Sequence, residues 1–194
     1  MTNNKKLVIF GSSAGGIEAA NAILPHLKLG SNSALWVSHI DVQTIGSRAA
    51  LYELGGEFFS EPYERYTIHS GKLYVIGNPE AECRRPYVSF NDITQVTVNP
   101  EPVKEIETNV SRTFAAAVRV YKYNLLAVIL KGAGNDGTRG AKIVKKQGGQ
   151  VIVQDLDISQ EFPGYMPHYA IVSRTVDHIL PLEGIVRYVN NFLQ

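Results

Sequence analysis

The sequence has little of what marks secreted, disulfide-bonded or membrane-embedded proteins. It holds one cysteine, Cys83, among 194 residues, so no internal disulfide can form. The longest purely apolar run, residues 125–130, is far shorter than the roughly 20 residues of a membrane helix. The polar start, residues 1–6, is unlike an export signal. We therefore expect a soluble, cytoplasmic protein with no membrane insertion.

The sequence also lacks an excess of charge of either sign. Nineteen Lys and Arg residues stand against 18 Asp and Glu, a formal charge of +1, which gives no general field to attract nucleic acid. The five histidines and the lone cysteine show no metal-ligand spacing, so we expect neither a metal nor a cofactor. With 44% apolar residues, residues 1–194 are expected to form a single domain.

Short apolar runs that alternate with helical patterns predict the fold class. Runs at 7–10, 34–37, 125–130 and 151–153 each end in a loop, and most are followed by apolar residues at helical spacing. This alternation is typical of a doubly wound, mostly parallel α/β sheet with helices on both faces. Between residues 57 and 98, β-rich runs at 66–68, 73–76, 87–90 and 95–98 predict an inserted β-hairpin region. Asn109 or Ser111 is expected to cap the helix that follows.

Two glycine loops, residues 11–16 and 132–137, directly follow predicted strands, where open α/β sheets bind ligands. The first loop departs from a dinucleotide fingerprint at Ser13, although Asp41 is placed as a ribose ligand would be. It departs from a phosphate-binding P-loop at Ile17, where lysine is required. A third interpretation makes Ser13 a nucleophile on a tight strand-to-helix turn.

A serine nucleophile needs a base and an acid at the same edge of the sheet. His39 follows the second predicted strand, and Asp136 follows the strand at 125–130, so both are expected at the carboxyl ends of strands with Ser13. Taken singly, Ser13 and Asp136 also fit the role of helix caps, and His39 that of a hydrogen-bonded residue at a strand end.

In combination, these residues resemble the catalytic domain of the chemotaxis receptor methylesterases (CheB). The family's G-A-S-T/A-G-G, its histidine after a strand and its L-T-G-M-G-x-D-G loop are matched by residues 11–16, 37–39 and 130–137. Residues 154–155, 166–171 and 176–182 resemble the later Q-D, G-M-P-x-x-A and D-x-x-L-P-L segments. The resemblance covers nearly the whole chain.

The resemblance implies a cofactor-independent serine esterase that hydrolyses glutamate methyl esters on chemoreceptor helices and deamidates glutamine there. The implied triad is Ser13, His39 and Asp136. The oxyanion and substrate cleft is expected to involve Ser12, Ala14, Gly132, Ala133, Gly134 and Met166.

Several residues around the implied cleft depart from the family pattern: Ser38, Ser111, Lys131, Ala133 and Tyr165. Lys131 is expected to lie near Asp136, to face an acidic substrate, or to be a surface residue that points to solvent. These departures leave open a second hypothesis, a CheB-like binding or scaffold protein with weak or no catalysis in chemosensory-type signalling. The family's N-terminal receiver domain does not precede the first predicted strand, so a stand-alone form regulated by a separate receiver protein is expected.

Overall fold

The computed structural model describes residues 5–38, 56–59, 63–76, 86–100, 109–156 and 165–194. All strand pairs of its main sheet are parallel. In spatial order the sheet contains β10 (His178–Leu180), β9 (Gln150–Gln154), β8 (Leu125–Ile129), β1 (Leu7–Ser12), β2 (Ser33–Ser38), β5 (Leu73–Ile76) and β3 (Gly56–Phe59). The predicted parallel α/β sheet is confirmed. After β2, Ile45, Ala49 and Tyr52 recur at helical spacing and predict a helix, but residues 39–55 lie outside the described part of the chain.

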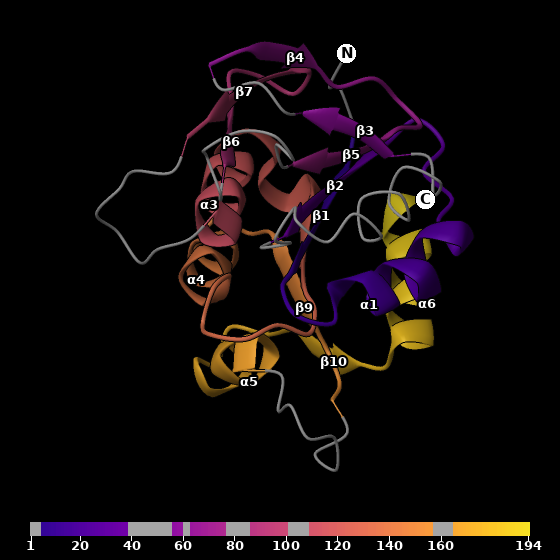
Figure 1. Cartoon of the computed structure of the whole chain (residues 1–194), viewed down its shortest axis with the longest axis vertical. Helices are drawn as coiled ribbons and strands as arrows, with labels where there is room; N and C mark the ends of the chain where they lie inside the picture. Colours follow the sequence, from indigo (N-terminus) through magenta and orange to yellow (C-terminus); the bar gives the residue numbers. More distant parts are fainter. Residues whose placement is uncertain (1–4, 39–55, 60–62, 77–85, 101–108, 157–164) are drawn as a thin grey trace.

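Helices cover both faces of this sheet (Figure 1). One face carries α1 (Gly16–Ile23), the 3₁₀ turn η1 (Leu24–His26) and α6 (Leu182–Leu193), and the other carries α3 (Asn109–Tyr121), α4 (Thr138–Lys146) and α5 (Tyr165–Val172). A second 3₁₀ turn, η2 (Lys122–Asn124), links α3 to β8.

Strand β1 shows why the sheet needs two layers of helices. Leu7 and Ile9 belong to the apolar cluster that includes α3, α4 and α5, and Val8 and Phe10 belong to the cluster of α1 and α6. All four are fully buried, as a continuous apolar run in a central parallel strand requires.

The inserted β region forms a second, antiparallel sheet of β4 (Arg65–Thr67), β7 (Gln95–Asn99) and β6 (Tyr87–Phe90). It packs on α3, where the Val88 N–H donates to Thr113 Oγ1 at 3.2 Å. The predicted hairpins are thus confirmed for three runs, but the prediction for 73–76 is wrong. Those residues form β5 of the main sheet, because Leu73–Ile76 is apolar throughout and buried on both sides.

Candidate active site

Ser13 is the first residue after β1 and stands in the loop that leads into α1. Its backbone N–H donates to the Lys131 carbonyl oxygen at 3.1 Å, and its carbonyl oxygen accepts the Gly16 N–H at 2.8 Å. Ser13 is half-buried, whereas Ser12 is fully buried as the last residue of β1. Of the two adjacent serines, Ser13 is therefore the one that solvent reaches.

Gly132, from the second glycine loop, packs directly against Ser13. A Cβ at Gly132 would lie 2.7 Å from Ser13 Cβ and 2.8 Å from Ser13 N, and would also collide with Met166 Sδ. The Met166 N–H donates to the Gly132 carbonyl oxygen at 3.0 Å. The fold thus brings together Ser13, Gly132 and Met166 from three separate segments, at a distance that only glycine at position 132 allows.

The other predicted cleft residues on the two loops are small and exposed. Ala14 follows Ser13, and Ala133 and Gly134 follow Gly132. A Cβ at Gly134 would meet nothing within 4 Å, although its φ of 88° favours glycine. Both loops therefore present small residues to solvent next to Ser13.

Asp136 is 2% exposed and lies at the N-terminus of α3. Its carboxylate accepts backbone N–H groups from Val110 (3.1 Å), Ser111 (2.9 Å) and Gly137 (2.6 Å). A buried carboxylate is stable there because these donors and the helix dipole compensate its charge.

The prediction that Asn109 or Ser111 caps α3 is therefore wrong, because the Asp136 carboxylate takes that role. The Val110 and Ser111 N–H groups bond to a residue 26 and 25 positions away, and the Ser111 hydroxyl accepts the Gly137 N–H at 3.0 Å.

The start of α3 also touches the ends of β1 and β2. The Val110 side chain packs directly on Gly11, and Asn109 Nδ2 donates to the Ser38 carbonyl oxygen at 3.5 Å. Ser38 is the register partner of Ser12 in the parallel pair. Asp136 is therefore joined through α3 to both strand ends. His39 follows Ser38 but lies outside the described residues, so its role stays a prediction.

Among the residues that the structure describes, three buried polar atoms beside these strand ends have no hydrogen-bond partner: Ser12 Oγ, Ser38 Oγ and Asn109 Oδ1. A Cβ at Gly16 would lie 2.5 Å from Ser12 Oγ and 3.7 Å from Ser38 Oγ, so both hydroxyls lie near the first residue of α1. Each unsatisfied group costs about 1–3 kcal/mol. The sequence did not predict this cluster. The only signal of it in the sequence is that each of two apolar strands ends in a serine.

Lys131 connects the two glycine loops. Its backbone N–H donates to Gln154 Oε1 at 2.8 Å, and its aliphatic stem crosses Gly15, where a Cβ would lie 2.8 Å from Lys131 Cδ. The half-buried side chain thus lies over the loop that holds Ser13. This position favours the expectation that Lys131 meets the substrate.

In the described part of the chain, no three His, Cys, Asp or Glu side chains gather in a way that would hold a metal ion. None of the helices in that part of the chain has the length and apolar character needed to cross a membrane.

Comparison with known proteins places this arrangement in a family. The model of the CheB methylesterase family matches residues 8–189. A Leptospira interrogans protein, provisionally named protein-glutamate methylesterase/protein-glutamine glutaminase, is 33% identical over 188 residues, which are 94% of this chain and 92% of that protein. A protein of that name from Bordetella parapertussis is 29% identical, and the match covers 94% of this chain and 52% of the relative.

A solved structure supports the fold. The catalytic domain of the CheB methylesterase of Thermotoga maritima superposes with a TM-score of 0.74 at 24% identity, covering 96% of this chain and 98% of that domain. The family-model match extends over nearly all of the seven-stranded sheet and both layers of helices. The chain belongs to the CheB methylesterase family.

Proposed function

We propose that this chain is a protein-glutamate methylesterase whose nucleophile is Ser13. It hydrolyses γ-glutamyl methyl esters on the cytoplasmic helices of chemoreceptors, releases methanol, and deamidates glutamine at such positions. Residues 1–194 act as one catalytic domain. The names of the relatives from Leptospira and Bordetella, protein-glutamate methylesterase/protein-glutamine glutaminase, support this activity.

In the proposed mechanism, His39 takes the proton of the Ser13 hydroxyl while the serine oxygen attacks the ester carbonyl. The tetrahedral intermediate collapses to an acyl-enzyme, and the proton passes from His39 to the departing methoxide. A water activated by His39 then hydrolyses the acyl-enzyme. Asp136 orients the imidazole and stabilises its protonated form, while backbone N–H groups of the two glycine loops stabilise the oxyanion.

The observation that carries the proposal is the position of Ser13. This serine is half-buried directly after the central strand β1, and its backbone N–H donates a hydrogen bond to the Lys131 carbonyl oxygen. Gly132 packs against it closely enough that any larger residue would displace it. A nucleophile held between two fixed loops meets the requirement that the reacting atoms be positioned before the reaction.

The proposal also extends to partners and location. The substrate is a protein helix, and the enzyme works in the cytoplasm without a cofactor, a bound metal or membrane insertion. A separate receiver protein is the proposed regulator. The exposed, small residues Ala14, Ala133 and Gly134 beside Ser13 suit a bulky substrate, because a helix can approach the loops without meeting large side chains.

The test is methanol release from a chemoreceptor fragment methylated on glutamate. We expect hydrolysis by the wild type and by Ser12→Ala, and none by a folded Ser13→Ala protein. Full hydrolysis by Ser13→Ala would overturn the assignment of the nucleophile. Binding of the fragment by the wild type without hydrolysis would favour the scaffold hypothesis instead.

A further inference from the structure

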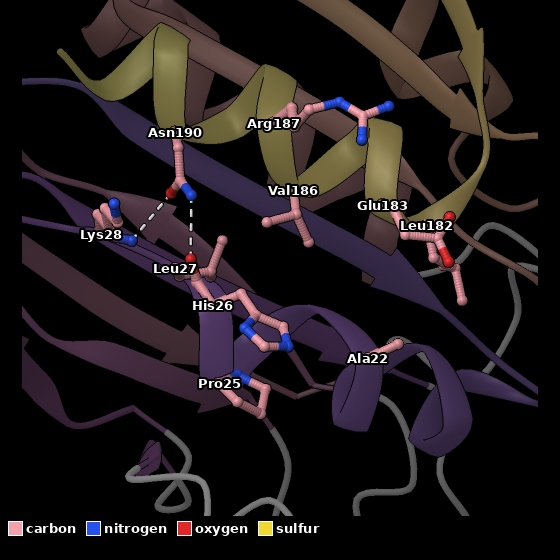
Figure 2. Close-up of a pocket in the computed structure, with 10 residues that line it drawn as sticks. All are labelled: Ala22, Pro25, His26, Leu27, Lys28, Leu182, Glu183, Val186, Arg187 and Asn190. Atoms are coloured by element: carbon pink, nitrogen blue, oxygen red, sulfur yellow. Dashed lines mark hydrogen bonds between the residues drawn. The ribbon is translucent and has the colours of Figure 1, made fainter.

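A groove separates α6 from the end of α1 and the segment after it (Figure 2). Its volume is about 730 Å³. Its floor is apolar and includes Leu27, Leu182 and Val186, each only partly buried although packed on the core cluster of α1 and α6. The groove is separate from the candidate active site. From α1 only Ala22, near its end, lines the groove. Gly16, which starts α1 beside Ser13, lies about 9 Å from Ala22 along the helix axis.

Two hydrogen bonds hold the two walls of the groove together. Asn190 Nδ2 on α6 donates to the His26 carbonyl oxygen at 3.0 Å, and Asn190 Oδ1 accepts the Lys28 N–H at 2.9 Å. Figure 2 shows both bonds crossing from α6 to the opposite wall. A groove fixed in this way needs little ordering when a partner binds, which reduces the entropic cost of binding.

The charges on the rim are unequal. Lys28 and Arg187 are exposed cationic side chains, and Glu183 is the one carboxylate among the residues that line the groove. Residues Leu182 to Asn190 extend about 12 Å along α6, enough for about two turns of a bound helix or four extended residues. A groove with an apolar floor and a mainly basic rim is complementary to a peptide that carries acidic groups around an apolar side chain.

We propose that this groove docks an acidic segment of a protein partner, with an apolar side chain of that segment on Leu27 and Val186 and its carboxylates near Lys28 and Arg187. A nucleic acid fits less well, because the floor presents aliphatic side chains rather than aromatic surfaces on which bases stack. The proposal does not depend on esterase activity, since none of these residues belongs to the candidate active site.

The test is fluorescence polarisation at low salt with the whole chain and a labelled peptide of repeating Glu-Glu-Leu. We expect saturable binding that the double variant Lys28→Glu/Arg187→Glu weakens by about tenfold or more, as repulsion replaces attraction at two places. Both side chains are exposed, and Asn190 bonds only the backbone of Lys28, so this variant keeps the fold. The matched control, Lys142→Glu/Lys146→Glu, reverses two exposed charges on α4, across the sheet (Figure 1), and should leave binding unchanged within about twofold.

Three results would overturn the proposal. One is the absence of saturable binding of the Glu-Glu-Leu peptide by the wild type. Another is equal weakening by the groove variant and the α4 control, which would indicate a general charge effect. The third is that a Lys-Lys-Leu peptide or a single-stranded oligonucleotide binds the wild type as tightly as the Glu-Glu-Leu peptide does, and that the groove variant abolishes this binding too. Retained binding by Ser13→Ala would support a docking surface that is independent of catalysis.

Discussion

Replacing Asp136 by asparagine should destabilise the protein through α3 as well as lower its activity. In the structure the carboxylate accepts three backbone N–H groups, two on Oδ1 and one on Oδ2. Asparagine keeps one acceptor oxygen, so the two bonds to Oδ1 can remain. Its amide NH₂ then faces the Val110 N–H as a second donor. A hydrogen bond to a charged group contributes about 1.5–3 kcal/mol.

The variant also loses a negative charge at the N-terminus of α3, which at a buried site destabilises the fold by at most about 2 kcal/mol. Part of this energy is already counted in the lost hydrogen bond. We therefore expect the free energy of unfolding to fall by about 3 kcal/mol. At 2–4 °C per kcal/mol for a chain of this size, the Tm falls by about 6–12 °C.

Thermal melting followed by circular dichroism measures this shift. The matched control is Glu183→Gln, because Glu183 is also an acid in the first turn of a helix but is exposed, so its loss should cost less than about 1 kcal/mol. A Tm change below about 2 °C for Asp136→Asn would refute the role of this carboxylate in holding α3. In the proposed triad the same variant should lose activity by about 10⁴-fold at temperatures where it is folded.

Three further predictions test the loops. Ser12→Ala removes a buried hydroxyl that has no partner within the described part of the chain and should raise the unfolding free energy by about 1 kcal/mol in urea titrations while activity remains; a loss of stability would contradict this. Gly132→Ala should displace Ser13 and lower kcat/KM about 100-fold, whereas Gly148→Asn, at a glycine of positive φ beyond the far end of α4 whose Cβ would meet open space, should keep it; equal effects would refute the packing argument. Lys131→Thr should lower kcat/KM several-fold on a methylated acidic receptor fragment at low salt and leave a small neutral ester unaffected; an equal loss with both substrates would exclude a role in attracting the fragment.

The sequence predicted the strands of the main sheet best where an apolar run could be buried only between two layers of helices, as at residues 125–130. It failed at 73–76, because a four-residue apolar run between turns has the same local pattern in a hairpin and in a parallel strand. The strands that it pairs with decide between the two. Tyr74 of β5 is in register with Leu35 of β2, 39 residues earlier, and with Glu57 of β3, 17 residues earlier, and neither strand is the next one along the chain.

For the site, the family resemblance predicted that Ser13, Gly132 and Met166 come together. Ser13 and Gly132 also stand in loops that directly follow strands, whereas Met166 lies in α5 and was placed in the cleft by the resemblance alone. They did not predict that Asp136 bonds the first N–H groups of α3. The local pattern around Asn109 and Ser111 suggested an ordinary cap, and nothing in the spacing shows that a buried carboxylate 25 residues away takes that place. Tertiary contacts of this kind have no signature in a single sequence.

The most direct test of the central claim is to find which residue reacts with an active-serine probe such as a fluorophosphonate. After trypsin, Ser12 and Ser13 lie in the same peptide, residues 7–28, so fragmentation in the mass spectrometer and the Ser12→Ala variant together assign the label. We predict that the wild type and Ser12→Ala carry the probe on Ser13 and that a folded Ser13→Ala protein carries none. A wild-type protein that hydrolyses the methylated receptor fragment while its label lies on another residue, or that remains unlabelled at Ser13, would contradict the account.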